Sequence, residues 1–138
     1  MAVKTYSLAK DGDTYLSTNF KVKEFRCSDG SDNILIDTDL VTYLQAIRDW
    51  AKAAVTINSA YRTESHNASE GGTKNSYHLK GMAADIVVSG KTPLAVARKA
   101  EDLGMKGIIK YPGFVHVDTR STKYFSNDSG STSCSTFY

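Results

Sequence analysis

Two stretches of the chain repeat apolar residues at the spacing of an amphipathic helix. The first begins at Thr38, where Asp37 or Thr38 itself can serve as the N-cap. Its apolar positions recur every three or four residues and are Leu40, Val41, Leu44, Ile47, Trp50, Ala51 and Ala54. The second follows Thr92-Pro93, a cap with proline in the first turn, and stops at Gly104. Both patterns predict helices with one apolar face.

Other stretches carry the signals of β-strands. Residues 55–61 alternate and are rich in β-branched side chains, so they predict a strand that delivers Arg62 at its end. Residues 85–89 continue as a strand, and residues 107–119 hold two apolar runs around Tyr-Pro-Gly, which is typical of a hairpin. Together these elements predict an α+β fold with a small, mostly antiparallel sheet that has the two helices on one face.

The segment 75–88 brings a histidine and an aspartate together with small residues between them. If one helix held both His78 and Asp85, they would lie about 10 Å apart, and one strand would send them to opposite faces. A loop that folds back lets both reach one ion, and Gly81 supplies the backbone freedom that such a loop needs. The segment therefore predicts half of a metal site.

His116 is the expected third ligand. On the second strand of the predicted hairpin, Phe114, His116 and Asp118 share one face, whereas Val115 and Val117 share the other. Two histidines, a carboxylate and a water form a typical catalytic zinc site, with three protein ligands and one open position. The alternative is that both histidines are ordinary hydrogen-bonded polar residues and that the aspartate caps a loop.

Two motifs resemble those of a known family. The first is SxHxxGxAxD over Ser76–Asp85, and the second is Phe-Val-His-Val-Asp over Phe114–Asp118. Both are similar to the motifs of zinc peptidases that include D-Ala-D-Ala carboxypeptidases and phage endolysins, with the Hedgehog signalling domain as a distant relative. The likeness runs from about Leu16 to Arg120. Further matching segments are Asn19–Phe25, Ser59–Arg62 and His66–Asn67.

The resemblance implies a zinc-dependent peptidase with one zinc ion per chain. Its substrate would be the peptidoglycan stem peptide, cut as by a D-Ala-D-Ala carboxypeptidase or by a cell-wall endopeptidase of phage type. Arg62 matches an arginine that holds or polarises the substrate, although it could also be a surface residue paired with Glu64 or Asp118. Ser76 could bind substrate or cap the loop.

The general base is the point where this chain departs from its relatives. Many of them carry Glu or Asp three residues before the last histidine, and this chain has Gly113 there. Asp118 is the nearest substitute, because it shares the strand face with His116. It could instead orient that histidine or pair with Arg62. Glu64 and His66 are further candidates for the base.

Two other functions remain open at this stage. A wall-binding or interaction domain could keep a structural zinc without catalysis, and the missing acid at Gly113 favours it. An intracellular peptidase that acts on free dipeptides is favoured by the lack of a secretory signal at the N-terminus.

Length and composition indicate one soluble globular domain, expected to be a monomer. The 138 residues suggest a single domain with a core over about residues 16–120 and a Ser/Thr-rich C-terminal extension over 121–138. The net charge of +2 is too small to suggest nucleic acid, and no stretch has the length of a membrane span. We expect a protein made in the cytoplasm without a signal peptide that acts at the bacterial cell wall, as a phage lysin or a virion component. Cys27 and Cys134 could form a disulfide or stay free.

Overall fold

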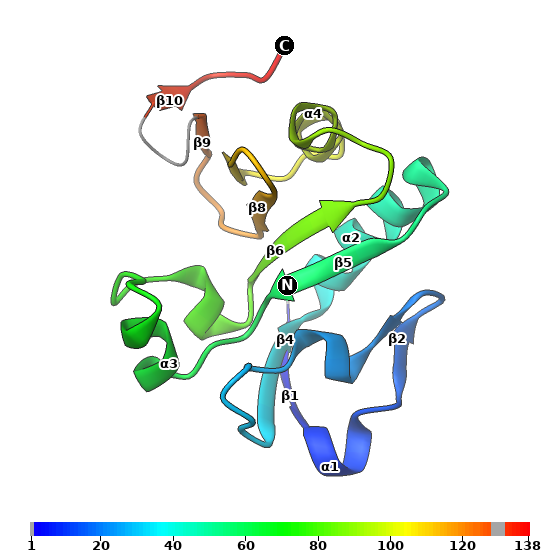
Figure 1. The fold of residues 1–138 in the computed structure, drawn as a ribbon, viewed down its shortest axis with the longest axis vertical. Helices are drawn as coiled ribbons and strands as arrows, with labels where there is room; N and C mark the ends of the chain where they lie inside the picture. The colour runs from blue at the N-terminus through cyan, green and yellow to red at the C-terminus, as the bar shows by residue number, and fades with distance from the viewer. Residues whose placement is uncertain (1, 128–131) are drawn as a thin grey trace.

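The main sheet of the protein has six strands. The computed structural model describes residues 2–127 and 132–138. The sheet has the strand order β10-β9-β7-β8-β6-β5, with β6 and β5 at one end and β10 at the other (Figure 1). Its strands are β5 (Val55–Ser59), β6 (Ala83–Val88), β7 (Gly107–Lys110), β8 (Val115–Asp118), β9 (Tyr124–Asn127) and β10 (Thr132–Cys134).

All neighbouring strands of this sheet are antiparallel except β7 and β9, which are parallel. The segment after residue 120, which we expected to be an extension, adds β9 and β10 to the sheet. Its Phe125 and Phe137 are buried, with ring centroids 5.3 Å apart. The C-terminal segment is therefore integrated into the domain core.

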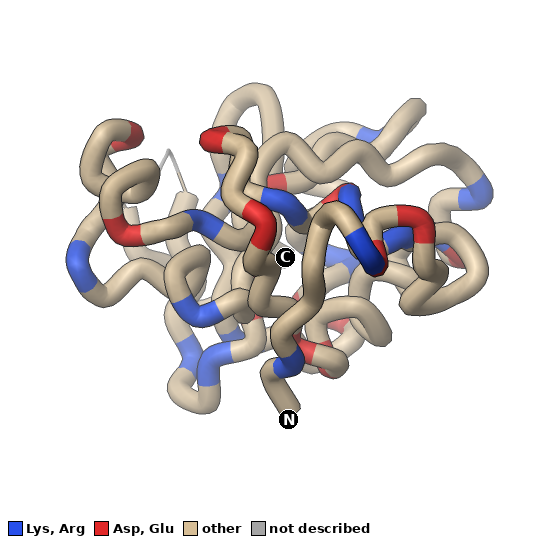
Figure 2. The backbone as a smooth tube through the Cα atoms, turned by 90° about the horizontal axis from the view of Figure 1, so that it is seen from below, with Lys and Arg blue, Asp and Glu red and all other residues tan. Residues whose placement is uncertain are grey.

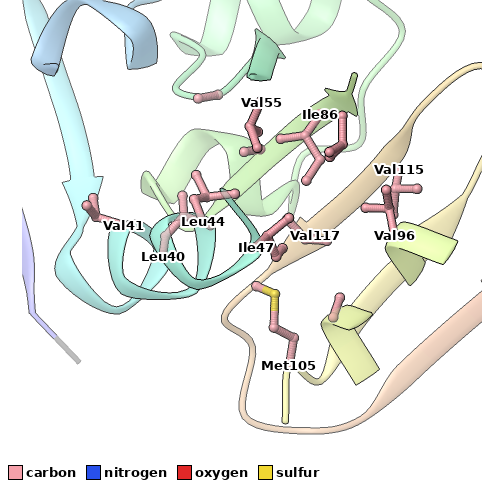
Figure 3. Close-up of a cluster of buried hydrophobic side chains, with 14 of the residues drawn as sticks. Leu40, Val41, Leu44, Ile47, Val55, Ile86, Val96, Met105, Val115 and Val117 are labelled. Atoms are coloured by element: carbon pink, nitrogen blue, oxygen red, sulfur yellow. The ribbon is translucent and has the colours of Figure 1, made fainter. Parts of the chain in front are cut away.

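Both predicted long helices pack on one face of this sheet. Helix α2 (Thr38–Ala51) contacts β5 and β6, and α4 (Pro93–Asp102) contacts β6, β7 and β8. The core between the sheet and the helices is built from the apolar faces of both, as Figure 3 shows. Its labelled side chains include Leu44, Ile47, Ile86, Val96, Val115 and Val117. This arrangement confirms the predicted α+β fold.

Helix α2 ends earlier than its apolar pattern suggested. Lys52 adopts a left-handed conformation with φ of 52°, and its N–H bonds back to the carbonyl of Arg48. This turn ends the helix at Ala51 and lets the chain enter β5 at Val55.

The N-terminal third forms a second layer that the sequence patterns did not predict. Strands β1 and β4 pair antiparallel, and β2 and β3 form a small hairpin that leads into a 3-10 turn, η1. These elements are β1 (Val3–Ser7), α1 (Leu8–Asp11), β2 (Tyr15–Ser17), β3 (Phe20–Lys21), η1 (Val22–Phe25) and β4 (Asn33–Asp37). Most side chains of β1 are exposed, so its sequence lacks the alternation that marks a half-buried strand.

Asp37 joins this layer to the main sheet. Its carboxylate accepts the N–H of Asp39 at 3.0 Å, which caps α2, and also the hydroxyl of Thr119 just after β8. Its backbone N–H donates to the carbonyl of Gly81 at 2.8 Å. Strand β4 is thereby held against the turn between His78 and Asp85.

Gly81 makes the close approach at this turn possible. It has φ of +73°, and a Cβ there would lie 2.4 Å from the carbonyl oxygen of Leu35 in β4. Gly90 also has a positive φ, of +76°, but a Cβ there would meet nothing within 4 Å. The two glycines therefore separate backbone strain from steric overlap.

We expect Gly81→Ala to lower the free energy of unfolding by about 2–5 kcal/mol, because strain and backbone overlap add. Gly90→Ala should cost only about 1–2 kcal/mol, from the left-handed conformation alone. Urea unfolding of both variants with an unchanged m-value measures the difference. Equal losses would show that the contact with Leu35 is not rigid.

Lysine and arginine side chains are interspersed with acidic ones along the backbone in the view of Figure 2. Within the described part of the chain, no helix is both long and apolar enough to cross a bilayer.

Candidate metal centre

Asp85 and His116 face each other on neighbouring strands. Residue 85 of β6 is the register partner of residue 116 of β8, so both side chains project from the sheet face opposite the helices. Their neighbours Ile86 and Val115 point to the other face, into the core. The Oδ1 atom of Asp85 lies 3.1 Å from Nδ1 of His116. Strand alternation therefore separates the polar site from the apolar core.

His78 comes from a short 3-10 turn, η2 (Tyr77–Lys80), that precedes β6. Ser76 caps this turn, because its hydroxyl accepts the N–H of His78 at 3.2 Å. At Gly81 the chain reverses, which brings Nε2 of His78 within 3.3 Å of Oδ1 of Asp85. The two residues thus approach each other through a folded-back loop, as the spacing predicted.

The three side chains form a compact and buried donor set. Within the described residues, His78, Asp85 and His116 are the only group of three that could hold a metal ion, and their ligand atoms lie within 4.8 Å of one another. Their exposed fractions are 4%, 8% and 7%. Two imidazoles and one carboxylate match the ligand preference of zinc. The residues present therefore fit a zinc ion.

Each histidine has its second ring nitrogen fixed. Nδ1 of His78 donates to the carbonyl oxygen of Ala60 at 2.7 Å, and Nε2 of His116 donates to Oδ2 of Asp118, also at 2.7 Å. Such outer contacts set the tautomer and the ring orientation of a metal ligand. They leave Nε2 of His78 and Nδ1 of His116 directed at Asp85.

The charges at the site support one another. Burial disfavours ionisation of Asp85, but hydrogen bonds from both histidines outweigh it and hold the pKa of this carboxyl far below its usual value. Burial likewise favours a neutral His116, but its hydrogen bonds to Asp118 and Asp85 raise its pKa to about 9. Metal uptake at neutral pH would therefore displace a proton from this ring.

Arg62 lies beside the trio, as its place after β5 suggested. Its Nη2 is 3.4 Å from Oδ2 of Asp85, the carboxylate oxygen not shared with the histidines. Its Nε donates to Ser59 at 3.0 Å, and its backbone N–H donates to the carbonyl of His78 at 3.1 Å. Arg62 thus contacts Asp85 rather than the alternative partners Glu64 and Asp118.

Asp118 is fully buried and contacts His116 on the side of the ring away from Asp85. Its two oxygens receive four hydrogen bonds, one from His116 and three from Arg120. Burial opposes ionisation, but the bonds from Arg120 and His116 lower the pKa of Asp118 to about 2. The carboxylate is therefore a weak base whose lone pairs are already used.

Glu64 and His66 lie on a separate short helix, α3 (Glu64–Ser69). Nε2 of His66 is 2.8 Å from the Ser28 hydroxyl and 3.5 Å from a carboxylate oxygen of Glu70. Glu64 lines a cavity of about 300 Å³ between α3 and η2, together with Asn67 and Leu79. Gly113 is exposed near the tip of the β7–β8 hairpin.

Sequence reasoning did not assign roles to several residues around the site. Asn67 is 2% exposed, and its amide oxygen lies 3.4 Å from Nη1 of Arg62. Tyr111 and Phe114 stack at 4.3 Å at the hairpin tip, one position beyond Ile109 and His116 on the metal-facing side. The match of His66-Asn67 to the family pattern was the available signal for Asn67, and no pattern singled out this function for the aromatic pair.

Both cysteines are free. Cys27 is buried beside Thr63, and Cys134 lies on β10. Neither belongs to the donor group.

We expect a Cys27→Ser, Cys134→Ser double variant to keep its bound zinc and its activity per folded molecule, because thiolates are not needed for this donor set. Metal analysis and a peptidoglycan digest measure both properties. Loss of metal by the folded variant would contradict the assignment of ligands.

Comparison with known proteins agrees with this geometry. A family model described as peptidase M15 matches residues 16–118. The chain is also 40% identical over 74 residues to "Probable peptidoglycan L,D-endopeptidase MepK" of Haemophilus influenzae, an alignment that covers 49% of this chain and 40% of that protein. The matched family segment includes all three candidate metal ligands and most of the main sheet. The chain therefore belongs to the peptidase M15 family.

Proposed function

We propose that this protein is a zinc-dependent peptidase that hydrolyses a peptide bond in the stem peptide of peptidoglycan. The observation that carries the proposal is the buried set of His78, Asp85 and His116, with ligand atoms within 4.8 Å of one another in a member of a peptidase family. We propose one zinc ion per chain, held by Nε2 of His78, Nδ1 of His116 and Oδ1 of Asp85.

A bound zinc ion would polarise the scissile carbonyl and bring the pKa of a bound water to about 7. The chain's own groups prepare the site for it. Ala60 and Asp118 fix the two imidazole rings, and Arg62 steadies the outer oxygen of Asp85.

Arg62 is the proposed substrate-binding residue. Its guanidinium is 14% exposed, and its two contacts at 3.4 Å to Asp85 and Asn67 are long, so a substrate carbonyl or carboxylate could compete for its N–H groups. Ser76 caps the turn that carries His78, which supports a structural role for its hydroxyl.

For Asp118 the contacts support the orienting role over that of general base. All four of its hydrogen bonds are made to His116 and Arg120, and it approaches the nitrogen of His116 that faces away from Asp85. The proton-transfer group is then to be sought at Glu64, at His66 or in the substrate, and Glu64→Gln tests the first of these by its effect on turnover at saturating zinc.

The class of bond is suggested by the relative. That protein is named as an L,D-endopeptidase, which favours endopeptidase over carboxypeptidase activity here. The chain spans only about 40% of the relative's length, so the shared segment carries the comparison and not the whole protein. Action at the bacterial cell wall follows from this substrate, and a phage lysin or virion component remains the proposed context.

A wall-binding domain with a structural zinc is the second candidate. Gly113, in place of the acid found in many relatives, is the observation that favours it. Such a domain would bind zinc and peptidoglycan without cutting either chain of the polymer.

One experiment separates the two. Purified peptidoglycan is digested with the zinc-loaded protein, and the released fragments are identified by mass spectrometry. New amino and carboxyl ends within the stem peptide are expected, and the fragments name the bond. Co-sedimentation with intact peptidoglycan in the absence of fragments would support the binding domain.

A further inference from the structure

Arg120 lies two residues after Asp118, just beyond the family match, and turns back onto that carboxylate. Its Nε donates to Oδ1 at 2.8 Å and its Nη2 to Oδ2 at 2.6 Å, while its backbone N–H donates to Oδ1 at 3.1 Å. The Asp118 side chain is fully buried, and the Arg120 side chain is 17% exposed. Paired bonds of this kind fix the direction of a carboxylate as well as its charge.

The guanidinium itself is held between two aromatic rings. Its central carbon lies 4.4 Å from the ring centroid of Tyr77 and 5.1 Å from that of Tyr124. Tyr77 directly precedes His78 on η2, and Tyr124 begins β9. Cation–π contacts on partly buried arginine limit its conformations. The side chain is therefore positioned by the turn that bears one histidine and by the C-terminal segment.

The sheet leaves room for this arrangement at one residue. Gly107 of β7 lies between Tyr124 of β9 and Asp118 of β8 in the register of the sheet. A Cβ at Gly107 would lie 1.8 Å from Oδ1 of Asp118. The missing side chain thus gives the carboxylate its space beside the strand.

From these contacts we infer that Arg120 is a positioning residue of the metal centre, which acts on His116 through Asp118 and is held in place by Tyr77 and Tyr124. The inference rests on the proposed zinc site. It extends that site to residues 119–127, which lie outside the segment that defines the family match.

The test measures zinc affinity, by competition with a chromophoric chelator, for wild type, Arg120→Ala and Arg120→Lys. Arg120→Ala should weaken zinc binding about 10-fold, the lower end of the range for residues that hold a metal ligand in place. Arg120→Lys keeps a cation but loses the planar fork, so its affinity should fall between the two. This second variant also serves if Arg120→Ala fails to fold.

Arg98→Ala is the matched control. Arg98 is likewise partly buried, donates to the C-terminal segment through Nε at 2.8 Å from the carbonyl oxygen of Phe137, and lies 5.1 Å from the ring centroid of Tyr138. It should lose stability in urea unfolding but keep the zinc affinity of wild type. An equal fall in zinc affinity for Arg98→Ala would mean that general destabilisation explains the effect and would overturn the inference.

A double-mutant cycle tests the route through Asp118. In an Asp118→Asn background, Arg120→Ala should have little further effect on zinc affinity, since the group it acts on has changed. Fully additive losses, or Arg120 variants that bind zinc as tightly as wild type, would overturn the inference and leave the proposed function intact. A wild-type protein without zinc affinity would overturn the proposed function, and this inference with it.

Discussion

Replacement of His78 or His116 by alanine is expected to abolish zinc binding and peptidoglycan hydrolysis together. Each change leaves two protein ligands where the site has three, and it also frees a partner: Ala60 in the first variant and Asp118 in the second. Because a full ligand is lost, the fall in hydrolysis should exceed about 10³-fold, beyond the 10–100-fold typical of outer contacts. Metal analysis of dialysed protein and fragment release from peptidoglycan measure both effects.

His66→Ala is the matched control for zinc. His66 is the third histidine of the chain, but it lies on α3 and contacts Ser28 and Glu70 rather than Asp85. This variant should keep one zinc ion per chain. Full zinc occupancy in both His78→Ala and His116→Ala would exclude the proposed site, whereas intact zinc without hydrolysis in wild type would favour the binding domain.

The second large effect concerns Asp118→Asn. The amide keeps the shape of the carboxylate but places an NH₂ group against either His116 or Arg120, both of which donate to Asp118. Weaker control of the His116 ring should lower zinc affinity by about 10–100-fold. Added zinc should then restore most of the activity, because the metal ligands themselves are unchanged.

A general base at this position predicts a different result. Turnover would fall by about 10²–10⁴-fold with zinc saturating, and added metal would not restore it. Asp102→Asn is a suitable control, since Asp102 also accepts a hydrogen bond from a C-terminal residue, the Tyr138 hydroxyl at 2.7 Å, but lies on α4. It should keep both zinc affinity and turnover.

The sequence by itself determined the elements that have a local signal. Helices α2 and α4 follow from their apolar period and their caps at Asp37 and Thr92, and strand β5 and the β7–β8 hairpin follow from alternation and turn residues. The metal ligands were identifiable because the spacing of His78 and Asp85 excluded a single helix or strand and the motif supplied His116. Each of these signals lies within a short segment of chain.

Only the tertiary structure decided how distant segments complete the site. The pairing of β1 with β4, the close approach of Leu35 to Gly81, and the joint at Asp37 connect residues with no local pattern in common. The parallel pairing of β9 with β7 places Tyr124 across Gly107 from Asp118 in the register of the sheet.

The role of Asp118 shows the physical reason. Strand alternation correctly placed it on the face of His116, but its distance from the metal-facing nitrogen depended on the ring orientation, and its charge depended on Arg120. Residue type and spacing specify which face a side chain occupies. Its partners, and therefore whether it acts as a base or as an orienting group, depend on contacts that form only when the strands, the turn at Gly81 and the C-terminal segment pack together.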